Sequence, residues 1–218
     1  MNTPLPADVP AARRERRKQA RPGELLAAAL DLFVEKGFAA TRSEEVAQRA
    51  GVSKGTLFLY FPTKEDLFKA VVRENMAQTI TAGAAAAQEF TGPASELIPY
   101  MMHLWWERFG STKASGLTKL MMSEATNFPE LAVFYYQEVI EPNFRLVRSI
   151  LQRGIDSGEF RCVDLDYAIF SILAPLIHLV TWKHSMGCCV SGDLQLDPIK
   201  YIATQADMVV HGLLKRNA

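Results

Sequence analysis

The chain has 218 residues and no formal net charge, and it is 49% hydrophobic and 22% charged. This composition indicates a folded globular protein of one or two domains and excludes a disordered chain. The start of the chain has no signal-peptide core and no stretch reads as a membrane span, so we expect a cytoplasmic protein.

Residue patterns typical of metal sites and enzymes are missing from the sequence. The cysteines, Cys162, Cys188 and Cys189, form no disulfide framework, because their number is odd and two are adjacent. His184 lies four residues before Cys188, but no further Cys or His pair completes a metal site. No Ser-His-Asp pattern or glycine-rich phosphate loop occurs. We therefore predict no metal, no cofactor and no enzymatic activity.

Positive charge is concentrated at the start of the chain, although the whole is neutral. Residues 1–80 hold 13 Lys and Arg against 10 Asp and Glu, whereas the remainder holds 11 against 14. Residues 1–20 are basic and lack a periodic apolar face, so we interpret them as a mostly disordered arm. Its charge either attracts phosphate non-specifically or only makes the chain soluble.

A first helix is predicted to begin near Arg21. Pro22 suits the first helical position, Glu24 suits the positive end of the helix, and Gly37 is a typical helix stop. Its apolar stripe comprises Leu25, Ala29, Leu32 and Phe33.

Two short helices follow, joined by a tight turn at Gly51. Thr41 and Glu44 have the spacing of a capping box for the first of them, and Ser53 is placed to cap the second. Two short helices joined by such a turn form a helix-turn-helix, here over residues 43–62.

The second short helix also contains a glycine. Gly55 costs about 1 kcal/mol relative to alanine inside a helix. The missing side chain would let the backbone approach a DNA groove closely, which offsets that cost. A fourth helix begins at Thr63, with Asp66 three positions later.

The run GFAATRSEEVAQRAGVSKGTLFLYFPTKEDLF resembles the DNA-binding domain of TetR-type regulators, over about residues 21–80. The most specific part is AGVSKGTLFLYFPTK at 50–64. The resemblance implies an all-α homodimer with an N-terminal three-helix DNA-binding domain and a larger helical domain for ligand binding and dimerisation. In that family the third helix enters the major groove, and the starts of helices two and four hold phosphates.

The same resemblance implies site residues by position. Arg42, Ser43 and Glu44 would lie at the start of the second helix, and Lys64 would hold phosphate. Arg42 replaces a common threonine and could strengthen a phosphate contact. Glu44 either completes the capping box or accepts from a cytosine amino group. The implied recognition surface comprises Lys54, Gly55, Thr56, Phe58 and Tyr60.

Phe58 stands where the family commonly has tyrosine. Loss of the hydroxyl removes a hydrogen bond to DNA, so Phe58 is expected to act through apolar or stacking contact, as with a thymine methyl group.

The remaining residues, 81–218, are predicted to be helical, because alternating strand patterns are missing. Pro142 predicts a kink or a split within its helix. The stretch Glu124 to Arg161 weakly resembles the regulatory domain of AefR-like regulators, which implies dimer contacts through the helices near 129–157 and 164–186. The expected helices span 94–109, 113–126, 129–157, 164–186 and 197–215.

Methionine and aromatic residues cluster at the start of this part. Each could be ordinary core, but as a group they suit an adaptable pocket for an apolar or aromatic ligand. His103 and His178 could add polar selectivity or be structural. The candidate ligand-binding residues are Met101, Trp105, Trp106, Phe109, Met121 and Met122.

These patterns predict a ligand-responsive transcription regulator. Its partners would be a double-stranded palindromic operator, a small-molecule effector and a second copy of the chain, with no membrane. Repression follows from the resemblance alone. The alternatives are an enzyme with its active site in the helical half, and an architectural protein that coats DNA without sequence preference.

Overall fold

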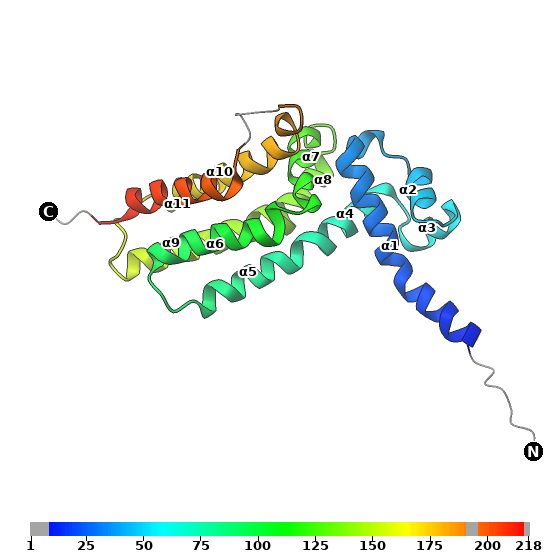
Figure 1. Cartoon of the computed structure of the whole chain (residues 1–218), viewed down its shortest axis with the longest axis horizontal. Helices are drawn as coiled ribbons and strands as arrows, with labels where there is room; N and C mark the ends of the chain where they lie inside the picture. Colours follow the sequence, from blue (N-terminus) through cyan, green and yellow to red (C-terminus); the bar gives the residue numbers. More distant parts are fainter. Residues whose placement is uncertain (1–8, 191–195, 216–218) are drawn as a thin grey trace, which may run out of the picture. The chain divides into compact units, whose positions relative to one another are not determined.

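The computed structural model describes residues 9–190 and 196–215, with side chains from residue 22 onward. The chain divides into two compact units, Met1–Val71 and Val72–Ala218. The domain boundary predicted from the sequence is residue 80, whereas the two compact units divide after Val71. Apart from one isolated β-bridge, Phe160 to Leu214, the regular structure of the described residues is helical, which confirms the all-α prediction (Figure 1).

The first helix, α1 (Val9–Ala40), begins earlier than we predicted. Residues 9–20 of the expected disordered arm are helical, and Pro22 lies inside the helix rather than at its start. This segment is rich in alanine and arginine, which are strong helix formers even without an apolar face. The rest of the predicted arm lies outside the described residues. Gly37 has a φ of 83° and interrupts the helical geometry where a stop was expected.

Three aromatic rings form the centre of the first unit. Phe33 and Phe38 come from α1 and Phe68 comes from α4, and their ring centroids lie 5.4–5.6 Å apart. Each ring is fully buried. Val46 and Leu57 add the buried faces of the two short helices. The remaining helices of this unit are α2 (Ser43–Arg49), α3 (Lys54–Tyr60) and α4 (Lys64–Val72).

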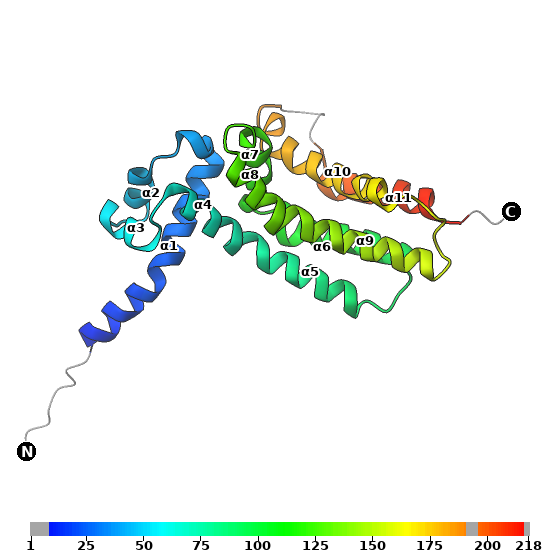
Figure 2. The same cartoon turned by 180° about the vertical axis from the view of Figure 1, so that it is seen from behind.

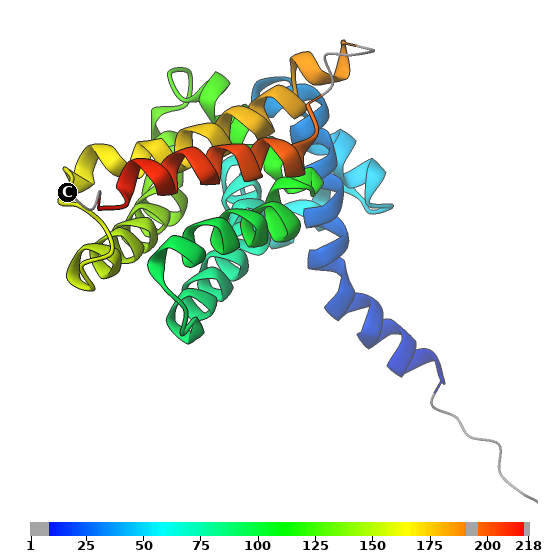
Figure 3. The same cartoon turned by 60° about the vertical axis from the view of Figure 1, so that its left-hand side comes forward.

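The second unit is a bundle of longer helices interrupted by three π-helical turns. Figures 1 and 2 show α5, α6 and α9 running alongside one another, and Figure 3 shows α11 beside α10. Pro142 lies just after one π turn, so the predicted irregularity takes this form. The elements are η1 (Arg73–Ala77), α5 (Gln78–Glu89), α6 (Ala94–Trp105), η2 (Trp106–Gly110), η3 (Lys113–Ser115), α7 (Gly116–Glu124), α8 (Pro129–Tyr135), η4 (Tyr136–Ile140), α9 (Glu141–Asp156), α10 (Leu165–Lys183), η5 (Met186–Cys188) and α11 (Pro198–Leu213).

The core of this unit joins α6, α9, α10 and α11. Phe160 is buried where the chain leaves α9, and its ring lies against Gly154. A Cβ at Gly154 would lie 2.1 Å from that ring, so the close approach requires glycine. A turn joins the end of α5 to the start of α6. Arg153 of α9 holds this turn, because its guanidinium donates to the carbonyl oxygens of Phe90 (2.9 Å) and Gly92 (2.6 Å).

The prediction that no stretch has the length and composition of a membrane span was wrong by those two criteria. Residues 165–188 meet both, because an 18-residue window within them has a mean hydropathy of 1.5. Ile169, Ile172 and Leu179 of this segment are buried in the helical core. A helix in the core of a protein can meet the same length and hydropathy criteria, because the side chains that it buries against other helices are apolar.

Candidate DNA interface and ligand cavity

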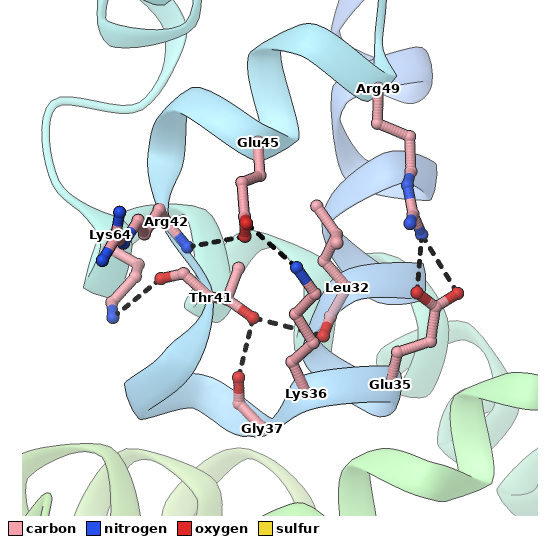
Figure 4. Close-up of polar contacts among 9 residues, drawn as sticks. All are labelled: Leu32, Glu35, Lys36, Gly37, Thr41, Arg42, Glu45, Arg49 and Lys64. Atoms are coloured by element: carbon pink, nitrogen blue, oxygen red, sulfur yellow. Dashed lines mark hydrogen bonds and ion pairs between the residues drawn. The ribbon is translucent and has the colours of Figure 1, made fainter.

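The start of α2 is held by contacts that differ from the predicted capping box. Thr41 is buried, and its hydroxyl lies 2.7 Å from the carbonyl oxygen of Gly37 and 3.2 Å from that of Leu32, so it donates toward α1 (Figure 4). The capping box of Thr41 and Glu44 was therefore wrong. The residue at the cap is Arg42, whose backbone N–H donates to Glu45 at 3.4 Å. The Thr41 hydroxyl is consumed in closing the end of α1.

Two ion pairs fasten α2 to α1. Lys36 donates to Glu45 at 2.9 Å, and the guanidinium of Arg49 donates to both oxygens of Glu35 at 3.0 Å (Figure 4). The hydrogen bond from Lys36 is the largest cause of a lowered pKa at Glu45. Such exposed pairs contribute little energy each, but they orient a helix that is too short to be stable alone.

Lys64, which is expected to hold phosphate, donates to three backbone carbonyl oxygens of the first unit. Its Nζ lies 2.8 Å from the oxygen of Phe38, 3.3 Å from that of Ala39 and 3.1 Å from that of Thr41. It also lies 4.4 Å from the centroid of the Phe38 ring. These carbonyls end α1 and lead into α2, so the ammonium joins the start of α4 to the connection between the first two helices.

The third helix is capped as predicted and presents an exposed face. The Ser53 hydroxyl accepts from the backbone N–H of Thr56 at 3.1 Å. Lys54 and Phe58 are exposed and share one side, with Nζ 5.6 Å from the ring centroid. The sequence did not single out Leu59, although it is 84% exposed. Leu59 directly follows the exposed Phe58, so α3 carries two adjacent exposed apolar residues, which makes Leu59 a candidate contact residue as well.

Glu44 pairs with Lys54 across the turn. The hydrogen bond from Lys54 is the largest cause of the lowered pKa of Glu44. Arg42 and Gly55 are exposed, whereas Ser43, Thr56 and Tyr60 are half-buried. The predicted DNA-contacting residues, Lys64 apart, therefore lie at the start of α2 and along α3, with Lys54 paired to a carboxylate when DNA is absent.

The second unit encloses a cavity of about 620 Å³. Its walls come from α5, α6, α7, α8, α9 and α10 and from all three π turns. Four of the six predicted ligand residues line it: Met101, Trp105, Phe109 and Met122. The other two do not, since Trp106 is buried in the helical core and Met121 is buried outside the cavity wall. On α6 and η2 the indole of Trp105 faces the cavity and that of its neighbour faces away.

Sequence reasoning missed the polar groups of the cavity. The hydroxyl of Thr118 lies 3.2 Å from the phenol oxygen of Tyr135, and burial raises the pKa of Tyr135 to about 12. Thr181 has a buried hydroxyl without a hydrogen-bond partner, and Asn143 and Arg108 also line the wall. These residues lie on separate helices that meet only in the folded chain, so no spacing in the sequence could predict them.

The last turn of α10 is fastened to the segment after η2. Lys183 donates to the carbonyl oxygens of Gly110 (2.9 Å), Ser111 (2.8 Å) and Thr112 (3.0 Å). The Ser115 hydroxyl lies 2.8 Å from Nε2 of His184. Ser115 is fully buried, which suits a packing contact rather than a nucleophile. Burial, with lesser effects from two lysines, lowers the pKa of His184 to about 4.

The other candidate histidines differ in position. The Nδ1 of His103 lies 2.8 Å from the carbonyl oxygen of Pro99, one turn earlier in α6, and His103 does not line the cavity. His178 lines the cavity, and its ring centroid lies 6.2 Å from that of Trp182 and 6.4 Å from that of Tyr201. Within the described residues, no group of three or more His, Cys, Asp or Glu could hold a metal ion.

Comparison with known proteins finds two family models, which match separate parts of the chain. Residues 25–71 match the family of bacterial regulatory proteins called tetR, and residues 106–209 match the C-terminal domain of AefR-like transcriptional repressors. The chain is 48% identical over 180 residues to the HTH-type transcriptional regulator RutR of Escherichia coli, covering 76% of each chain.

Two solved structures show the same fold. One is the transcriptional regulator FadR of Bacillus subtilis in complex with stearoyl-CoA, with a TM-score of 0.74 at 23% identity, over 87% of this chain and 98% of that one. The other is a regulator from Saccharomonospora viridis in complex with choline, with a TM-score of 0.75 at 19% identity, over 91% and 100%. The motif of residues 50–64, the two family matches and the RutR similarity agree, and the chain therefore belongs to the TetR family of DNA-binding transcriptional regulators.

Proposed function

We propose that the protein is a homodimeric repressor that binds a palindromic operator and releases it when a small apolar or aromatic ligand enters the helical unit. The observation that carries the DNA-binding part is the exposed face of α3, capped by Ser53 and bearing Lys54, Gly55 and Phe58. In this proposal the two copies of α3 enter successive major grooves about 34 Å apart.

In this proposal α3 supplies the base contacts, and phosphate contacts come from both α3 and the start of α2. Phe58 and the exposed Leu59 contact thymine methyl groups, while Arg42 and Lys54 contact phosphate. To make this contact, Lys54 must leave the carboxylate of Glu44 and bind a phosphate oxygen. The new contact should weaken as the salt concentration rises, as other phosphate contacts do. The ammonium of Lys64 acts indirectly in this proposal, because it orients the start of α2.

We propose that the dimer forms through α10 and α11. The sequence favoured the helices near 129–157 and 164–186. The outer face of α9 is polar, with Arg148 and Gln152 exposed, whereas Tyr167 on α10 and Met208 on α11 are large apolar residues, each more than 60% exposed. Two helices from each subunit would then form a four-helix bundle about a two-fold axis and cover this apolar face.

Ligand response is supported by the cavity of about 620 Å³, which is in the range of drug-sized ligand sites. The ligand lowers operator affinity only to the extent that it binds the DNA-free arrangement more tightly. The relatives FadR and the Saccharomonospora regulator carry stearoyl-CoA and choline in their structures, which supports a ligand site without naming this one.

A fluorescence-anisotropy titration tests the DNA-binding part. The labelled DNA is the intergenic segment upstream of the protein's own gene, compared with a scrambled duplex over a range of salt concentrations. Lys54→Ala should weaken binding, and Arg145→Ala, which removes an exposed cation on α9 and outside the proposed dimer helices, should not. Equal affinity for the two duplexes at every salt concentration would contradict a sequence-specific regulator and favour an architectural protein.

A further inference from the structure

Four of the polar residues that line the cavity lie toward one end. The others are Thr79, Asn143 and His178, and the side-chain amide of Asn143 donates to the carbonyl oxygen of Val139. Lys183 joins the end of α10 to the carbonyl oxygens that follow η2, so these two helix ends meet. Thr181 lies two residues before Lys183, and Arg108 lies two residues before Gly110, so both are at this end. Thr118 and Tyr135 join them, because α7 follows Ser115, which contacts His184.

The opposite end of the cavity is apolar. At Gly83, a Cβ would lie 3.7 Å from Leu146 Cδ2 and from Met101 Cε. Phe170 packs edge-on against Phe144 at 5.3 Å. With a rise of about 1.5 Å per residue, Phe170 and Thr181 lie about 16 Å apart along α10. The cavity is therefore long, with one polar end and one apolar end.

The charge at the polar end is positive. No Asp or Glu is among the described residues that line the cavity. The guanidinium of Arg108 is exposed and has no ion-pair or hydrogen-bond partner in the part of the chain that the structure describes. The ammonium groups of Lys183 and Lys119 both act on His184, close to the same end. A cationic head group would be repelled here, and an anionic one attracted.

The buried hydroxyl of Thr181 is the second observation that points to a ligand. A buried polar atom without a partner costs about 1–3 kcal/mol, and proteins seldom leave one unsatisfied. Thr181 lines the cavity at the same end as the cation, but its hydroxyl oxygen is covered by protein atoms, so a change of its χ1 rotamer must turn the hydroxyl toward a ligand atom before the hydrogen bond can form.

We propose that the cavity binds an anionic amphiphile, with a carboxylate or phosphate head between Arg108 and Thr181 and an unbranched apolar tail that extends to Gly83. This inference names the ligand class and rests on the proposed ligand response. Arg108 supplies a charge-assisted hydrogen bond at the open end, and Thr181 donates its hydroxyl proton to a head-group oxygen. Tyr135 stays protonated near neutral pH and can donate a further hydrogen bond.

Isothermal titration of the full chain without DNA tests the ligand class separately from DNA release. Decanoate and decyl phosphate, which distinguish the two anionic heads, are compared with decanol and decylamine. At least one anion should bind about tenfold or more tightly than decanol, and decylamine should bind more weakly still. Decanol or decylamine binding as tightly as both anions would overturn the proposal.

Two variants test the residues. Arg108→Gln should weaken binding of the anion about tenfold and leave decanol unchanged, whereas Arg145→Gln, at an exposed arginine outside the cavity wall, should change neither. Thr181→Val should weaken binding of the anion, because the hydroxyl that donates to the head group is lost. It should also raise the melting temperature of the ligand-free protein, because it removes a buried hydroxyl without a partner. Equal affinities of the Arg108 and Arg145 variants would overturn the assignment. If the anion binds the protein as expected but does not release it from the operator, the proposed function is contradicted and the ligand class is not.

Discussion

Replacement of Lys64 by methionine separates a structural from a DNA-contacting role. The methionine keeps an unbranched apolar stem and removes the ammonium that lies 2.8–3.3 Å from three carbonyl oxygens. Two of these carbonyls belong to the end of α1 and one to Thr41, just before α2. We therefore expect Lys64→Met to loosen the connection that sets the angle between those helices.

The expected loss can be worked out from the contacts. A hydrogen bond to a charged group contributes about 1.5–3 kcal/mol, and a surface cation–π contact adds about 0.5–1 kcal/mol. Lys64 is half-buried, so water compensates part of the three bonds. We expect a net loss of about 2–3 kcal/mol from the stability of the first unit, which corresponds to at least about thirtyfold in its opening equilibrium.

Native-state hydrogen exchange resolved by residue is the suitable assay. Tryptophan fluorescence would not report on this unit, because Trp105, Trp106 and Trp182 all lie in the second. The amides of the first unit should lose protection about thirtyfold or more in Lys64→Met and keep it in the exposed-site control Lys54→Met. If Lys64→Met weakens DNA binding but leaves protection as in the control, the lysine is a phosphate contact and the structural reasoning fails.

Three further predictions address other residues. Gly55→Ala should stabilise α3 by about 0.5–1 kcal/mol, since a Cβ there meets only Ser53 Oγ at 3.8 Å, yet weaken operator binding; unchanged affinity by anisotropy would refute close approach of the backbone to DNA. The pKa of His184 is lowered from 6.5 to about 4, so the unfolded chain binds more protons between these values and stability falls with falling pH by about 1–2 kcal/mol after screening. In urea titrations followed by tryptophan fluorescence, His184→Gln should flatten that dependence, and unchanged slopes would contradict it. Gly154→Ala should cost about 1–3 kcal/mol, and adding Phe160→Leu should recover part of it; additive losses would refute the clash.

Local signals predicted the helix-turn-helix well, because its chemistry is encoded within a few residues. The Ser53 cap, the stop at Gly37 and the turn at Gly51, which has a φ of 66°, all depend on neighbouring backbone groups. The capping box at Thr41 was wrong for a non-local reason. Its hydroxyl bonds to Leu32, nine residues earlier, and that partner is fixed by the packing of α1 against α2.

The cavity was predicted only in part, because its wall depends on tertiary packing. The methionine and aromatic cluster placed Met101 and Trp105 in the right helix, but periodicity could not distinguish Trp105 from Trp106, which face opposite ways. Thr181 reads in the sequence as one more residue of an apolar helix. Its importance appears only when the hydroxyl is found buried without a partner.

The three π-helical turns explain why the helix pattern failed at this wall. A π turn inserts one extra residue into a helix and rotates every later side chain relative to the ideal 3.6-residue period. Met76, Phe109 and Val139 belong to these turns, and all three line the cavity. The turns therefore direct toward the cavity side chains that a 3.6-residue period would place on other faces, so no period in the sequence could assign the wall.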